Sequence, residues 1–139
     1  MIADADPDSP SVYVDTSVLA AVLAPDEAHH SAARAWLEDH REGLVTSIVA
    51  EVELMRALAR RRAPESARAA AQDILAGCEL VEVMEEIRAV ASDLQPSSLR
   101  TLEALHVATA VMAGLRAFAT LDARQRVGAD EAGLASAGL

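Results

Sequence analysis

Acidic side chains occur in four separate segments of the chain, each beside an apolar run. They are Asp15, one of Glu51 and Glu53, Glu103, and Asp122. Carboxylates brought together from distant segments repel one another unless a cation lies among them, and oxygen-only ligand sets select hard ions such as Mg²⁺ or Mn²⁺. An ion held in this way activates water and stabilises charge on a phosphodiester. The acids therefore indicate a site for a divalent ion that acts on phosphodiesters.

Each acid alone also has an ordinary structural explanation. Asp15 could cap the helix that follows it, and Glu103 could be a favourable charge in the first turn of a helix. Asp122 could be a turn residue. No His or Cys set competes for zinc, because the adjacent His29 and His30 would face different ways on a helix. The combination of four acids, rather than any one of them, favours the metal site.

Short apolar runs alternate with helical segments along the chain. The segments expected to form strands are residues 11–14, 43–47, 78–83 and 116–120. The segments between them read as helices, including one over residues 27–40 capped by Asp26. This alternation predicts an α/β fold with a mainly parallel central sheet of four or five strands flanked by helices. Sites in such sheets lie beyond the carboxyl ends of the strands, where Asp15 and Asp122 stand.

The composition indicates a globular chain with an acidic surface. It has 139 residues, 52% of them apolar, and a formal charge of −10. We expect a flexible acidic arm over residues 1–10 and a single domain over residues 11–139. All twelve basic residues are arginine. Because an acidic chain is a poor general binder of nucleic acid, a polyanionic substrate would need metal ions and local arginines.

The sequence also indicates where the chain works. No apolar run approaches the about 18 residues that a membrane span needs, so no membrane partner is expected. The first residues lack the basic and apolar regions of a signal peptide. The single cysteine, Cys78, cannot form an internal disulfide. We therefore expect a cytoplasmic protein.

Four segments form an ordered set of motifs: "VYVDTSVL", "TSIVAEVELMRAL", "RTLEALHVATAV" and "FATLDARQ". In order and spacing the set resembles the PIN domain as found in VapC toxins of type II toxin–antitoxin systems. The resemblance runs from about Val12 to Arg126, nearly the whole chain. It implies a PIN-like fold and a Mg²⁺-dependent endoribonuclease, with Mn²⁺ as a possible substitute. It also implies a homodimer that a cognate VapB-type antitoxin holds inactive.

The resemblance assigns roles to particular residues. The acids that it implies bind the metal and carry catalysis are Asp15, Glu53, Glu103 and Asp122, with Ser17 and Thr120 as supporting hydroxyls. At position 103 the family more often has Asp, so Glu103 lengthens the arm by one methylene. Helical periodicity leaves the choice between Glu51 and Glu53 open, since the two point about 200° apart. The family pattern of acid, apolar residue, any residue, Arg and Ala matches "ELMRA" at Glu53, which makes Glu51 the weaker candidate.

Other residues near the motifs have two interpretations each. Arg100 and Arg124 flank the acids and could meet the scissile phosphate, or be ordinary surface residues. His106, one turn after Glu103, is expected in the core beside the site, with a ligand or general base as the alternative. Trp36 is expected in the core or in a groove for the antitoxin.

Two other classes of protein compete with a ribonuclease. A phosphoacceptor receiver domain is also small and α/β, but it needs paired acids after the first strand and a late lysine, which this chain lacks. A catalytically inactive PIN-like binding module is the stronger alternative, because Glu103 departs from the family pattern. Metal binding distinguishes an active ribonuclease from an inactive module, because an inactive module binds no Mg²⁺ at the site.

Overall fold

The computed structural model describes residues 11–139, and the acidic arm expected over residues 1–10 lies outside them. The strands are β1 (Val12–Val14), β2 (Leu44–Ser47), β3 (Glu79–Val81), β4 (Ala117–Ala119) and β5 (Ala135–Ser136). The helices are α1 (Thr16–Leu23), α2 (His30–Asp39), α3 (Ile48–Arg60), α4 (Glu65–Ala76), α5 (Glu85–Asp93), α6 (Thr101–Met112) and α7 (Ala123–Glu131), with a short 3₁₀ turn η1 (Arg41–Gly43). The strands lie in the order β3-β2-β1-β4-β5, and all pairings are parallel. The predicted α/β class is confirmed.

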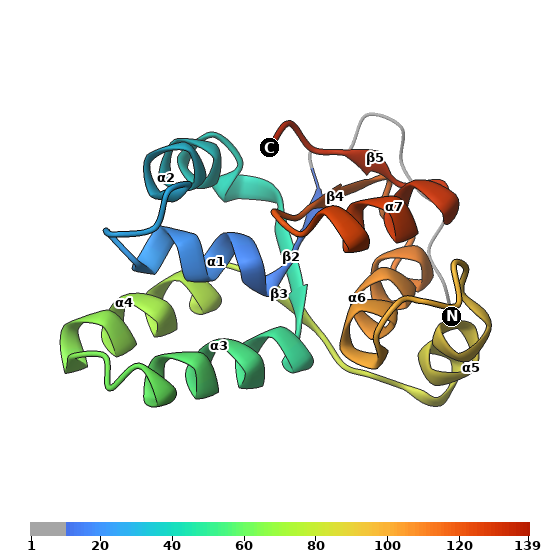
Figure 1. Ribbon diagram of the computed structural model, residues 1–139, viewed down its shortest axis with the longest axis horizontal. Helices are drawn as coiled ribbons and strands as arrows, with labels where there is room; N and C mark the ends of the chain where they lie inside the picture. Colours follow the sequence, from blue (N-terminus) through green and yellow to red (C-terminus); the bar gives the residue numbers. More distant parts are fainter. Residues whose placement is uncertain (1–10) are drawn as a thin grey trace.

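Strand β1 is apolar on both faces because helices cover both sides of the sheet. Successive side chains of a strand point to opposite faces. Val12 and Val14 therefore enter one buried cluster with α1 to α4, whereas Tyr13 enters a second cluster with Phe118, α6 and α7. Figure 1 shows α1 to α4 on one side of the strands and α5 to α7 on the other. The molecule has three layers, and β1 lies at their centre.

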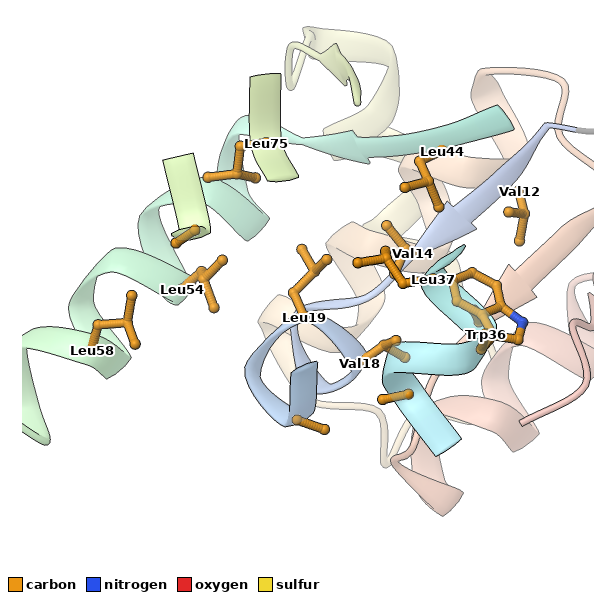
Figure 2. Packing of buried hydrophobic residues seen from close by; sticks show 14 residues of the cluster. Val12, Val14, Val18, Leu19, Trp36, Leu37, Leu44, Leu54, Leu58 and Leu75 are labelled. Carbon is orange, nitrogen blue, oxygen red and sulfur yellow. The ribbon is translucent and has the colours of Figure 1, made fainter. Parts of the chain in front are cut away.

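The larger core is built from aliphatic side chains (Figure 2). Val18 and Leu19 of α1 and Leu54 of α3 are fully buried in it. Trp36 of α2 is 6% exposed and packs into the same cluster, where its indole N–H donates to the carbonyl of Ala137 at 2.6 Å. Trp36 is therefore a core residue that joins α2 to the end of the chain.

Helix α2 begins later than the sequence predicts. The expected cap at Asp26 is wrong, because α2 starts at His30 and Asp26 lies in an exposed turn. The backbone N–H of Glu27 donates to the carbonyl of Ala24, and that of His30 donates to Glu27. The segment thus forms successive turns, and the helix does not begin until His30. None of the helices between residues 11 and 139 is both long and apolar enough to cross a membrane.

The order of the strands places the ends of β1 and β4 side by side. From the central β1 the chain builds β2 and β3 on one side, then crosses to build β4 and β5 on the other. The order reverses between β1 and β4, and ligands of open α/β sheets bind at such a switch point, beyond the carboxyl ends of the strands. The N–H of Asp15, directly after β1, donates to the carbonyl of Ala119 in β4 at 2.9 Å. The fold thereby brings Asp15 and the segment leading to Asp122 to one place.

Candidate metal-binding site

Asp15 is fixed by hydrogen bonds from two segments that the sheet brings together. It caps α1, and its Oδ2 accepts the backbone N–H of Ser17 at 3.2 Å and the Ser17 hydroxyl at 2.7 Å. The hydroxyl of Thr120, just after β4, donates to the same oxygen at 3.1 Å. The side-chain amide of Gln125 also faces Asp15, 2.8 Å from Oδ2, and we assign its nitrogen to that position because a carboxylate only accepts hydrogen bonds. Asp15 is 4% exposed, and both hydroxyls expected to support it lie against it.

Glu53 reaches the same place from α3. Its Oε1 accepts the hydroxyl of Thr16 at 3.1 Å and forms a short hydrogen bond with Nε2 of His106. Burial raises the pKa of Glu53, but these hydrogen bonds and the charges of His106 and Arg60 outweigh it and lower the pKa from 4.5. Glu53 is therefore an anion at neutral pH, as a metal ligand must be.

His106 lies between the two acids. Its Nε2, bonded to Glu53, is also 3.6 Å from Oδ1 of Asp15. Its Nδ1 is 2.6 Å from the hydroxyl of Tyr13, and the ring is 2% exposed. His106 is therefore buried in the core beside the site, which is the first of the two interpretations given above. It lies between Asp15 and Glu53.

The carboxylates of Glu103 and Asp122 face the same groove but are engaged by helix ends. Oε2 of Glu103 accepts the backbone N–H of Arg100 at 3.0 Å in the first turn of α6. Oδ1 of Asp122 caps α7 by accepting the N–H groups of Arg124 at 2.9 Å and Gln125 at 3.2 Å. Glu103 thus holds the helix-start role that the sequence offers for it, whereas Asp122 caps a helix instead of serving as a turn residue, and both line the groove.

The four acids border one open groove of about 530 Å³. It is lined by Asp15, Thr16, Ser17, Ala20, Glu53, Arg100, Thr101, Leu102, Glu103, His106, Asp122 and Gln125. Among residues 11–139, no three His, Cys, Asp or Glu side chains stand close enough together to hold a metal ion between them as they are placed. Oxygen donors around an open groove still suit Mg²⁺, which keeps several of its waters and binds through one or two carboxylates. The donor set therefore fits a hard divalent ion.

Three candidates from the sequence differ in their placement. Arg100 lines the groove, whereas Arg124 is exposed and does not line it. Glu51 is half-buried on α3 and, unlike Glu53, is not among the lining residues. Thr16 and Gln125 contact the acids although neither stood out in the sequence. Their contacts depend on the order of the strands, which no local sequence pattern predicts.

Comparison with known proteins identifies the family. The PIN domain family model matches residues 12–130. The chain therefore belongs to the PIN domain family, in the group of VapC proteins. It is 38% identical over 127 residues to "Ribonuclease VapC46" of Mycobacterium tuberculosis, covering 90% of this chain and 95% of that relative.

Solved structures of similar fold agree with this assignment. VapC20 of Mycobacterium tuberculosis, described as a sarcin-ricin loop cleaving toxin, superposes with a TM-score of 0.73 over 84% of this chain and 94% of its own, at 22% identity. A toxin–antitoxin complex from Klebsiella pneumoniae gives a TM-score of 0.69 over 87% of this chain and 94% of its own, at 20% identity. At these identities the likeness concerns the fold.

Proposed function

We propose that this chain is a divalent-metal-dependent endoribonuclease and the toxin of a type II toxin–antitoxin system. The observation that carries the proposal is the convergence of Asp15 and Glu53 on one groove at the switch point of the parallel sheet, with Glu103 and Asp122 in its walls. The relative named as a ribonuclease, similar over nine-tenths of this chain, supports RNA as the substrate.

Asp15, Glu53, Glu103 and Asp122 would hold the ion, Mg²⁺ or Mn²⁺. When bound, such an ion supplies an activated water and neutralises charge that develops on the phosphodiester. Glu103 and Asp122 accept backbone N–H groups in the structure, so their participation depends on the oxygens or rotamers that these bonds leave available.

The side chains around the acids hold them in position. Ser17 and Thr120 donate to Oδ2 of Asp15, which leaves Oδ1 directed toward His106 and the groove. Thr16 and His106 hold Oε1 of Glu53. Arg100 is the cation in the groove wall that can bind a non-bridging phosphate oxygen.

The test is RNA cleavage by the purified chain, freed of any antitoxin, with Mg²⁺ and then with excess EDTA. We expect cleavage with Mg²⁺, loss of cleavage in EDTA, and recovery when Mg²⁺ is restored. Full cleavage in excess EDTA would contradict the metal-dependent mechanism. Calorimetry on the same sample addresses the inactive binding module, which should show no Mg²⁺ binding that depends on Glu53 or Glu103.

The partner that we propose is a VapB-type antitoxin. The solved toxin–antitoxin complex with the same fold supports this partner, and a chain of net charge −10 suits a partner segment rich in basic residues. Co-expression with the product of the adjacent gene should give a complex that survives purification and cleaves no RNA. Separate elution of the two proteins would contradict this pairing.

A homodimer is also proposed. Ile48, Val52 and Leu102 are 42%, 54% and 46% exposed beside the groove, and large apolar side chains grouped in this way favour a protein contact. Light scattering on the purified chain should give about twice the mass of one chain, and Val52→Glu should reduce it to that of one chain. A wild-type mass of a single chain would contradict the dimer.

A further inference from the structure

A buried chain of hydrogen bonds leads from the sheet to Glu53. We propose that His106 is a positioning residue, held by Tyr13 and Ser47, which fixes the Glu53 carboxylate opposite Asp15. The proposal deepens the proposed function and rests on it for its effect on cleavage. Its structural part, the hydrogen bond itself, can be tested without RNA or metal.

The contacts form an unbroken series across four elements. The Tyr13 hydroxyl in β1 is 2.9 Å from Oγ of Ser47 at the end of β2, and 2.6 Å from Nδ1 of His106 in α6. Nε2 of His106 then bonds Glu53 in α3. Ser47 itself accepts the N–H of Ala50 at 3.2 Å, which ties the series to the start of α3. Both ring nitrogens of His106 are therefore engaged.

The available protons fix which atom donates to Glu53. Tyr13 has one hydroxyl proton and can give it either to Nδ1 of His106 or to Ser47. In the first case the imidazole is neutral and its remaining proton is on Nε2. In the second case Nδ1 must donate to Tyr13, and both ring nitrogens carry protons. Either way Nε2–H donates to Glu53, because an ionised carboxylate offers no proton in return.

Tyr13 and Ser47, which hold His106, are more tightly packed than the Glu53 side chain at the other end of the series. Tyr13 and Ser47 are fully buried, and the Tyr13 ring stacks on Phe118 with centroids 5.1 Å apart. The Glu53 side chain is 28% exposed and has three rotatable bonds of its own. Buried ring nitrogens need hydrogen-bond partners in any case, but His106 does not merely fill the core, because one of its partners is anchored in the sheet and the other is a carboxylate that lines the groove. His106 instead fixes the Glu53 carboxylate relative to the buried residues of the sheet.

Substitutions at His106 and Tyr13 test the effect on cleavage. His106→Ala should lower kcat by about 10- to 100-fold, as removal of a group that orients a metal ligand typically does, with little change in KM. His106→Gln places an amide N–H near the position of Nε2 and should restore most of kcat. Tyr13→Phe removes only the anchoring hydroxyl and should lower kcat by less than His106→Ala. His40→Gln, outside the groove, is the matched control and should keep wild-type kcat.

Two kinetic results would overturn the positioning role. One is wild-type kcat in His106→Ala. The other is a kcat of His106→Gln as low as that of His106→Ala when both variants melt at the wild-type temperature. If His106→Ala does not fold, the comparison of Tyr13→Phe with His40→Gln decides in its place, and equal kcat values for these two would contradict the proposal.

A spectroscopic measurement on the metal-free chain tests the hydrogen bond directly. With ¹⁵N-labelled histidine, Nε2 of His106 should show a proton that exchanges slowly with water, and Glu53→Ala should remove that signal. A signal unaffected by Glu53→Ala, or an Nε2 without a proton, would overturn the proposal. A wild-type chain that cleaved no RNA would contradict the proposed function, whereas this measurement would still decide the role of His106.

Discussion

At the scale of single residues, Asp15 caps α1 in a way that leaves room for the ligand role that we propose for it. Its Oδ2 accepts the N–H of Ser17 as the cap of α1, and it also accepts the hydroxyls of Ser17 and Thr120. Its Oδ1 faces His106 across 3.6 Å at the edge of the groove. Because the cap occupies one oxygen, the other can bind an ion, and the two roles are compatible.

The two glutamates of α3 give a matched comparison. Glu53 borders the groove and Glu51 does not, although they are two residues apart. We expect Glu53→Gln to lower kcat for RNA cleavage by about 10- to 100-fold, because it removes the negative charge of a proposed metal ligand. Glu51→Gln should keep a kcat near that of wild type. Single-turnover cleavage under saturating Mg²⁺ measures both. Equal losses in the two variants would show that the choice of Glu53 is wrong.

The lowered pKa of Glu53 predicts how stability depends on pH. Burial opposes the shift, but the hydrogen bond from His106 and the nearby charges keep the folded pKa below 4.5. Glu53 therefore stabilises the metal-free fold above pH 4.5, and this contribution is lost as pH falls through the folded pKa. Glu53→Gln should flatten the decline in melting temperature below pH 4.5. Parallel melting profiles for wild type and variant would contradict this assignment.

At the scale of secondary structure, two substitutions at Asp122 distinguish its helix-capping role from the ion binding that we propose. It begins α7 by accepting two backbone N–H groups. Asp122→Asn keeps an oxygen for the cap but removes the charge, so we expect near wild-type stability with reduced cleavage. Asp122→Ala should also lose about 0.5–2 kcal/mol of unfolding free energy.

Urea unfolding of both Asp122 variants measures their free energy of unfolding. RNA cleavage assays on the same variants measure their activity. An Asn variant that cleaved RNA at the wild-type rate would limit Asp122 to its structural role. An Ala variant as stable as wild type would contradict the importance of the cap.

The elements themselves follow largely from local sequence, whereas their arrangement does not. "VYV" predicts a strand buried on both faces, and Ser47 predicts the start of α3, because both depend on neighbouring residues. The sequence predicts the start of α2 too early, because the residues after Asp26 form turns until the helix begins at His30. Strand order arises from packing between distant segments, so only the structure reveals that His106 lies between Asp15 and Glu53.

At the scale of the whole molecule, the RNA substrate that we propose would have to approach a chain with a formal charge of −10. Arg100 is the only arginine lining the groove in the described part of the chain. For single-stranded nucleic acid, each phosphate contact changes affinity by only about threefold between 50 and 200 mM salt. We expect KM to rise by less than about tenfold over that range at fixed Mg²⁺. A rise of about a thousandfold would indicate an extended basic surface and contradict this view of substrate binding.

The central claim is that the groove beside Asp15 cleaves RNA with a divalent ion. Its most direct test is the cleavage rate of Asp15→Asn beside wild type, in Mg²⁺, with melting temperatures measured on the same samples. Asn retains a good helix cap, so the variant should fold. We predict that it folds and that cleavage falls to the level of wild type in EDTA. Wild-type cleavage by the folded Asp15→Asn protein would contradict the claim.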